Sequence, residues 1–218
     1  MTRSPAHHPA GDTLLCHAAG RLSAGAALVV ATHLAGCAQC RDAIRLGEAI
    51  GGVLLADCPP ATMAADALDR TLARLGDPAS RPRPEADASE LSPGVPMPAP
   101  LRDAVRRPWR WVAPGISRIT LDLNGAAPGE RAYLLRVTPG SALPGHGHRG
   151  AEITCVLSGH FHDSGWRYGA GDVAEMDAGQ DHEPIAEPGE ACICLIATQG
   201  RLRMHGLMAR LLQPLVGV

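Results

Sequence analysis

The spacing of apolar positions changes twice along the chain and predicts three parts. Over residues 12–75 the chain is rich in Ala and Leu at helical spacing, and proline occurs only at 59–60. Residues 76–108 contain eight of the 19 prolines, with Ser, Asp and Glu between them. After that, short runs such as "AYLLRVT", "EITCVLSG", "VAEM" and "ACICLIAT" alternate with Gly, Pro and Asp turns, which is typical of strands in a sandwich or barrel.

These patterns predict an α+β multidomain chain. We expect an all-α domain over residues 1–76, a Pro-rich linker over 77–108 that behaves as an extended spacer, and an all-β domain over 109–218. Leucines and a methionine in the tail 205–215 recur at helical spacing, which predicts a short amphipathic helix at the end of the chain.

Composition narrows the function classes. The net charge of −2 offers no basic surface for nucleic acid. The first residues lack the apolar core of a signal peptide, and no apolar run reaches the roughly 20 residues of a membrane span. We therefore expect a soluble, cytoplasmic protein without direct nucleic-acid or membrane partners. In a reducing compartment its seven cysteines favour metal or redox roles over a disulfide framework.

The stretch "THLAGCAQC" places His33, Cys37 and Cys40 at the spacing of metal ligands. Ser23 is a suitable N-cap for a helix to about Gly36, and the apolar face of that helix leads into all three side chains. A closed tetrahedral zinc site needs a fourth ligand. The alternative is a buried histidine beside two small buried cysteines. Candidates for the fourth ligand are His7, His8, Cys16, His17 and Cys58.

A second group of metal-type side chains lies in the β-rich part, in "GSALPGHGHRGAEITCVLSG" and "GDVAEMDAGQDHEPIA". His146 and His148 alternate along a strand and so face the same side, Glu152 begins the next strand, and His182 comes from another hairpin. Three imidazoles and one carboxylate inside a small barrel suit a divalent ion such as Zn, Fe, Mn or Ni. The alternative is a metal-free cavity with a polar lining.

The N-terminal segment, from "HHPAGD" to "CAQC", resembles the zinc-binding domain of ChrR-type anti-sigma factors. The resemblance implies that His8 joins His33, Cys37 and Cys40 around zinc. It also implies a helical domain that clamps between the two domains of an extracytoplasmic-function (ECF) sigma factor and blocks polymerase and promoter binding.

The two C-terminal motifs resemble the cupin superfamily over about residues 110–200, and the first motif fits at every position. The second departs from the usual pattern at Asp177 and Ala186, which are scaffold positions. The resemblance implies a double-stranded β-helix barrel. It also implies a divalent metal, with zinc expected, held by the side chains of His146, His148, Glu152 and His182.

Two weaker features accompany these motifs. His160 and His162 share one face of a strand and could support the metal ligands, although solvated side chains are the more common outcome. Cys192 and Cys194 share one face of a late strand, as a redox pair or as small core residues.

Together these features favour a regulator over an enzyme. We expect an anti-sigma factor that binds an ECF-type sigma factor 1:1 through its helical domain. An oxidative signal, such as singlet oxygen, would act at the cupin metal and release the sigma factor. The alternatives are a dioxygenase-like cupin metalloenzyme and a cupin storage or ligand-binding module. Apolar positions that could contact the sigma factor, or instead fill the domain's own core, are Leu46, Ile50, Val53, Leu54, Leu68, Leu72 and Leu75.

Overall fold

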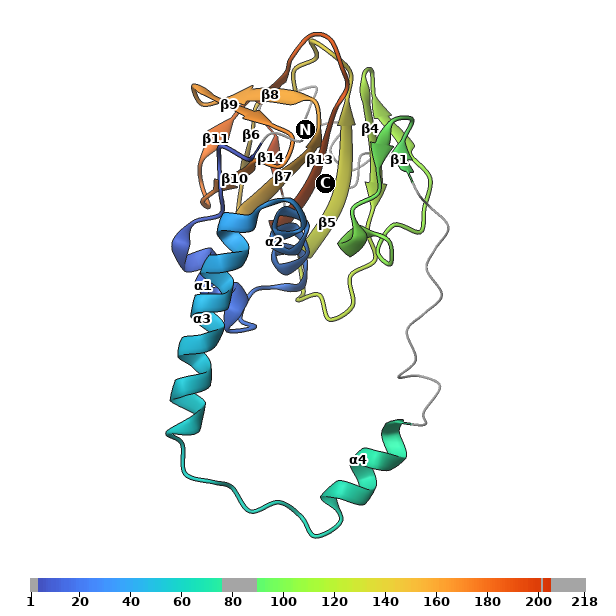
Figure 1. Ribbon diagram of the computed structural model, residues 1–218. Coiled ribbons are helices and arrows are strands. Elements are labelled where there is room, and N and C mark those ends of the chain that lie inside the picture. The colour runs from blue at the N-terminus through green and yellow to red at the C-terminus, as the bar shows by residue number, and fades with distance from the viewer. Residues whose placement is uncertain (1–3, 76–89, 201, 205–218) are drawn as a thin grey trace.

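The computed structural model describes residues 4–75, 90–200 and 202–204. Helices occupy the first third and strands the rest, as the spacing of apolar positions predicts (Figure 1). The expected tail helix falls outside the described residues. The helices are α1 (Gly11–Ala18), α2 (Ala24–Gly36), α3 (Ala38–Ala56) and α4 (Ala67–Leu75).

The strands form two facing layers. The larger layer is an antiparallel six-stranded sheet in the order β10-β7-β13-β5-β4-β3, and two small sheets, β11-β6-β14 and β12-β8-β9, face it. The larger sheet contains β3 (Arg110–Ala113), β4 (Ile116–Thr120), β5 (Glu130–Val137), β7 (Glu152–Ser158), β10 (Val173–Met176) and β13 (Cys192–Gln199). The small sheets contain β6 (His146–His148), β8 (His160–Asp163), β9 (Trp166–Gly169), β11 (Asp181–His182), β12 (Ile185–Ala186) and β14 (Leu202–Met204).

Strand β13 is buried on both faces. Ile193, Leu195 and Ala197 belong to the core beneath the helices, whereas alternate positions such as Cys194 and Ile196 belong to the core between the sheets. Helix α2 packs across β13, β7 and β5 (Figure 1). Burial on two sides explains why "CICLIAT" is an unbroken apolar run and does not alternate with polar residues.

The N-terminus of α2 is stabilised by the β-rich part of the chain. Ser23 occupies the N-cap position, as predicted, but its side chain does not cap the helix. The Gly25 N–H instead donates to the carboxylate of Glu130, at 2.5 Å. A carboxylate is favourable at the positive end of a helix, so this contact ties the first long helix to the sheet.

The Pro-rich segment is more ordered than expected after residue 89. Its residues form the hairpin of β1 (Glu90–Ser92) and β2 (Val95–Pro96) and the 3₁₀ turn η2 (Ala99–Leu101), which packs against α2. Leu91, Met97 and Leu101 are buried in the core beneath the helices. The expectation of an extended spacer is therefore wrong for residues 90–108, because three spaced apolar side chains fix the segment despite its prolines. The boundaries 1–76, 77–108 and 109–218 remain a prediction.

Helices α3 and α4 leave this core. Ile44 is the last buried residue of α3, and α4 has no buried residue among those described. The C-terminal half of α3 extends away from the sheets, and α4 stands apart from them (Figure 1). None of the described helices is long and apolar enough to cross a membrane.

We predict that Leu101→Ala destabilises the chain by about 2–5 kcal/mol, because this side chain of η2 is fully buried and η2 packs against α2. Leu68→Ala is the matched control, since Leu68 is 67% exposed, and it should change stability by less than about 0.5 kcal/mol. Denaturant unfolding followed by circular dichroism measures both. Equal stability of the two variants would mean that residues 90–108 are not part of the fold.

Candidate metal centres and an exposed helix face

The first site joins the N-terminal segment to the junction of α2 and α3. The side chains of His8, His33, Cys37 and Cys40 converge so that one ligand atom from each lies within 4.8 Å of all the others. His8 Nδ1 lies 3.4 Å from each sulfur, and His33 Nε2 lies 3.3 Å from Cys40 Sγ. A tetrahedral zinc ion with bonds of about 2.1–2.3 Å separates its ligand atoms by roughly 3.5 Å, so these four fit one ion.

A break between the two helices brings the cysteines together. Cys37 is extended and serves as both the C-cap of α2 and the N-cap of α3, and Cys40 lies in the first turn of α3. The predicted helical face therefore does not continue through Cys40, although the three side chains still converge. The Cys40 N–H donates to Cys37 Sγ at 3.5 Å, so the backbone of α3 orients the first sulfur.

The surroundings favour the neutral ring of His33 and disfavour the thiolate of Cys40. His33 Nδ1 donates to the carbonyl oxygen of Gly171 at 2.7 Å, which leaves Nε2 as the free lone pair. Burial lowers the pKa of His33, so its ring is neutral, as a metal ligand requires. Burial and the neighbouring Cys37 sulfur raise the pKa of Cys40 to about 12. Both sulfurs can be thiolates together only beside a cation, so the donor set suits a divalent metal.

The structure separates the candidates for the fourth ligand. His8 reaches the group, whereas His7 packs against the rings of Trp166 and Tyr168, and its Nε2 lies 3.1 Å from the Arg167 carbonyl oxygen. Three other candidates lie outside the group, namely Cys16, His17 and Cys58.

The second site lies inside the barrel. His146 and His148 on β6 meet His182 on β11, because β6 and β11 pair with His146 opposite His182. The Nε2 atoms of His148 and His182 lie 2.9 Å apart. Glu152, at the start of β7, places Oε2 3.6 Å from His148 Nε2. Three imidazoles thus form one compact group, and the predicted fourth ligand lies beside it.

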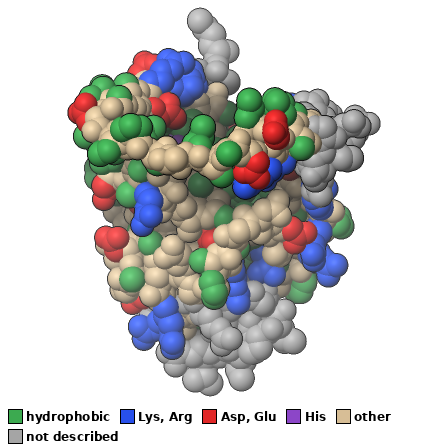
Figure 2. All heavy atoms as spheres, turned by 90° about the horizontal axis from the view of Figure 1, so that it is seen from below, with side chains coloured by type: hydrophobic (Ala, Val, Ile, Leu, Met, Phe, Trp, Pro, Cys, Tyr) green, Lys and Arg blue, Asp and Glu red, His purple; other side chains and the backbone are tan. Residues whose placement is uncertain are grey.

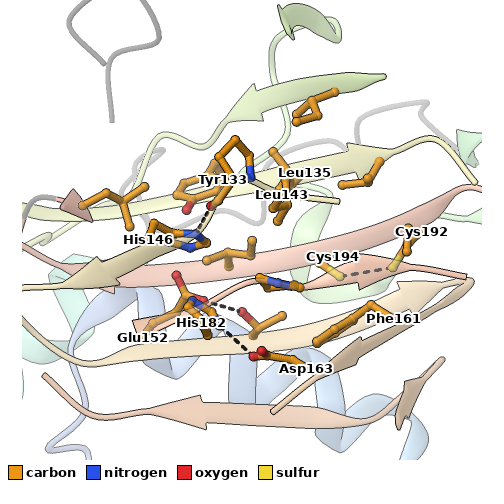
Figure 3. A pocket seen from close by; sticks show the side chains of 18 of the residues that line it. Tyr133, Leu135, Leu143, His146, Glu152, Phe161, Asp163, His182, Cys192 and Cys194 are labelled. Atoms are coloured by element: carbon orange, nitrogen blue, oxygen red, sulfur yellow. Dashed lines mark hydrogen bonds and ion pairs between the residues drawn. The ribbon is translucent and has the colours of Figure 1, made fainter. Parts of the chain in front are cut away.

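Hydrogen bonds from the outer ring nitrogens orient two of these imidazoles. His182 Nδ1 donates to Asp163 Oδ2 at 2.7 Å, and His146 Nδ1 donates to the Pro144 carbonyl oxygen at 2.8 Å. Each ring therefore keeps its Nε2 lone pair for a ligand (Figure 3). Asp163 belongs to this candidate site and was not predicted from the sequence. It faces the cavity from β8 together with Phe161, whereas His162 is exposed and His160 half-buried on the other face.

Burial disfavours the charged forms of Glu152 and His148 in this site. Burial raises the pKa of Glu152 to about 7. Burial, with help from the two neighbouring imidazoles, lowers the pKa of His148 to about 4. Burial also lowers the pKa of His182, but the hydrogen bond to Asp163 and the charge of Glu152 outweigh it, so the net shift is upward. A divalent ion would stabilise the carboxylate and the neutral imidazoles together.

A cavity of about 180 Å³ is lined in part by His146, His182 and Glu152. Its walls are mostly apolar and include Leu135, Leu143 and Phe161 (Figure 3). Arg118 of β4 also lines the cavity. Cys192 and Cys194 are both buried and both line it, with sulfurs 3.6 Å apart. The two thiols therefore share a face, as predicted, and are at once core residues and cavity lining.

The outer helices carry an exposed apolar face. Leu46, Ile50, Val53 and Leu54 follow helical spacing on α3 and are 52–64% exposed. Leu68, Leu72 and Leu75 on α4 are 54–73% exposed. Seen from below, hydrophobic side chains lie open among charged ones (Figure 2). These residues do not fill a core of their own, so the alternative raised by the sequence is wrong for them.

The chain is thus a two-part protein, in which a helical domain with a His₂Cys₂ cluster is joined to a cupin-like barrel with a three-histidine cluster. Residues 101–201 match the family model described as the ChrR cupin-like domain. The chain is 39% identical to the anti-sigma-E factor ChrR of Cereibacter sphaeroides over 95% of this chain and 96% of that protein. The chain belongs to the ChrR family of anti-sigma factors.

A solved structure of a ChrR protein is also similar to this chain. The crystal structure of Rhodobacter sphaeroides SigE in complex with the anti-sigma ChrR matches with a TM-score of 0.73 and 36% identity, over 90% of this chain and all of that one. An RmlC-like cupin from Ralstonia eutropha JMP134 matches with a TM-score of 0.40 and 25% identity, over 44% of this chain and 64% of that one.

We predict that Glu152→Gln stabilises the metal-free chain at pH 8. The folded pKa of about 7 lies above the usual value of 4.5, so stability falls as the pH rises from 4.5 to 7 and stays low above that. The gain should be about 1–3 kcal/mol at pH 8 and close to zero at pH 4. Denaturant unfolding of chelator-treated protein at both pH values measures it. A loss of stability at pH 8 would show that the carboxylate is not penalised by burial.

Proposed function

We propose that this chain is a cytoplasmic anti-sigma factor that sequesters an ECF-type sigma factor in a 1:1 complex. Its helical domain, held by zinc, would occupy the sigma factor. A metal in the cupin barrel, with zinc expected, would report an oxidative signal that ends the complex. Membership of the ChrR family supports this proposal, as does the likeness over 90% of the chain to a ChrR structure solved with SigE.

The exposed apolar face of α3 and α4 is the observation that carries the proposal. Beyond Ile44, the leucine, isoleucine and valine side chains on these helices are at least half exposed, although the same chain buries such residues elsewhere. A contiguous apolar surface on a water-exposed helix marks an interaction site. An apolar stripe on a helix suits docking against the helices of a folded partner.

Zinc at His8, His33, Cys37 and Cys40 would explain how so small a helical unit keeps its shape. Apolar side chains on α3 that face a partner cannot also form a core. Four coordinate bonds supply stability that the contacts of α1, α2 and the first turns of α3 would otherwise have to provide. The ion would fix the angle between α2 and α3 and so the direction in which α3 leaves the barrel.

The cupin barrel is the part that suits sensing. Its cavity gathers oxidisable side chains around the metal-type cluster: imidazoles, the thiols of Cys192 and Cys194, and the thioethers of Met176 and Met204. Oxidation of any of these would change the polarity or size of a tightly packed site. A ChrR-family chain is a regulator and not an enzyme, so the dioxygenase-like alternative is not favoured.

We predict that Ile50→Asp combined with Leu54→Asp weakens the sigma complex at least about 100-fold, because two charges would enter an apolar contact. Both side chains are more than half exposed in the free chain, so its fold should persist. Co-expression with ECF-type sigma factors of the source genome, followed by gel filtration and titration, measures the complex.

Arg45→Asp is the matched control for this pair. It introduces the same side chain on the same helix, roughly on the opposite side from Leu54, at a residue whose only described ion pair is an exposed one with Asp42. The control should bind as the unchanged chain does. Equal binding by the double variant and the control would remove the α3 face from the interface.

We predict that His146→Ala combined with His148→Ala lowers the metal content by one ion per chain and abolishes release of the sigma factor by an oxidant, while the complex itself still forms. The physical reason is that these imidazoles lie in the barrel and the apolar face lies on α3 and α4. Metal analysis and oxidant-treated gel filtration measure the two effects. Loss of sigma binding would show that the division of labour is wrong.

A further inference from the structure

The segment that carries His8 is bonded to a turn of the cupin barrel. The N–H groups of Ala6 and His7 donate to Asp172 Oδ1 at 2.6 and 3.0 Å. The N–H of Val173 donates in return to the carbonyl oxygen of His7 at 3.1 Å. The backbone of His7 is therefore fixed on both sides, and His8 follows it directly.

Asp172 is suited to hold this segment. Its side chain is buried, and its second oxygen accepts the N–H of Gly169 at 2.8 Å, which orients the carboxylate within its own turn. A buried carboxylate that accepts several backbone N–H groups makes short, charge-assisted hydrogen bonds. The carboxylate thus points from the turn to the N-terminal segment in one defined direction.

The same turn also orients the second histidine. The carbonyl oxygen of Gly171 accepts the hydrogen bond from His33 Nδ1. Gly171 has φ +92°, and a Cβ there would lie 3.0 Å from Pro5 Cγ, so only glycine suits this close approach. One turn of the barrel, residues 169–173, therefore contacts the side chain of His33 and the backbone that immediately precedes His8.

Sheet geometry explains why the segment lies there. Strand β10 is at the edge of the six-stranded sheet, where its backbone groups would lack a neighbouring strand. The N-terminal segment covers that edge through the Val173–His7 hydrogen bond, and the Ala10 N–H donates to Glu175 Oε1 further along β10 at 3.3 Å.

We propose that Asp172 is a positioning residue for the N-terminal metal centre, acting through the backbone of Ala6 and His7 to place His8, while the Gly171 carbonyl places His33. The inference rests on the zinc site of the proposed function and deepens it, because the cupin domain then contributes to the metal centre of the anti-sigma domain. The turn also continues into β10, which pairs with β7 so that Met176 lies opposite Glu152. The barrel ligand and the N-terminal centre are thus attached to neighbouring strands.

The test uses the full chain, cobalt(II) as the probe, and the variants Asp172→Ala and Asp172→Asn. Of the two metal-type groups among the described residues, only the N-terminal one contains cysteines. The sulfur-to-cobalt charge-transfer band therefore distinguishes this group from the three imidazoles of the barrel. We expect Asp172→Ala to bind cobalt about 10–100-fold more weakly at this site. Asp172→Asn should lose less, because an amide keeps one acceptor oxygen for the two N–H groups.

Asp177→Asn is the control, since Asp177 is an exposed aspartate of the same domain, five positions further along the chain. It should leave the band unchanged. Cobalt bound without the band reports the barrel site, and it should be unaffected in all three variants, which separates positioning from general loss of fold. A cobalt affinity and band of Asp172→Ala equal to those of the unchanged chain would overturn the proposal.

Two further measurements keep the proposal testable. If Asp172→Ala does not fold, hydrogen exchange of the unchanged, metal-loaded chain replaces it: the amides of Ala6 and His7 should be protected, and exchange at the rate of an unstructured peptide would overturn the proposal. Cys37→Ser combined with Cys40→Ser should abolish the band. Persistence of the band there would refute the zinc site itself, which is a different failure from that of Asp172.

Discussion

Strand β13 is buried on both faces, and this burial determines where the helices and the small sheets must lie. One set of its side chains needs a helical layer, and the alternate set needs a second sheet. Helix α2 covers the first set and the small sheets enclose the second. With α2 fixed in this way, the junction with α3 falls beside the edge of the large sheet, and α3 points past the barrel. Its outer half then has no sheet to pack on, which leaves an apolar face open.

Both clusters follow the same electrostatic logic. Cys37 and Cys40 bring two sulfurs together in a buried place, and Glu152 brings a carboxylate into an apolar cavity. Burial raises the pKa of Cys40 and of Glu152, so each group is costly in its charged form without a cation. Hydrogen bonds to Gly171, Pro144 and Asp163 meanwhile turn histidine lone pairs inward. Such arrangements gain their stability when a divalent ion is bound.

Sequence spacing predicts the local features well. The helices, the faces of the strands, the convergence of the N-terminal group with His8 as the resemblance implied, and that of the three barrel histidines agree with the structure. Glu152 lies beside the three histidines and is not part of their group. Features that depend on distant segments could not be predicted. Alternation in "HFHD" shows that two faces exist but not that Asp163 is on the inner one. The prolines around Leu91, Met97 and Leu101 suggest a spacer. Nothing in the local sequence reveals that these three side chains pack in the core beneath the helices. Contacts of Asp172 with Ala6 join residues 166 positions apart.

In the proposed complex, a pair of helices held by a metal presents an apolar face to a sigma factor. Hydrogen–deuterium exchange of the full chain, free and in complex with its sigma factor, tests this most directly. We expect strong added protection in α3 after Ile44 and in α4, with little change in the strands of the barrel. Protection confined to the barrel, with α3 and α4 exchanging as in the free chain, would contradict it.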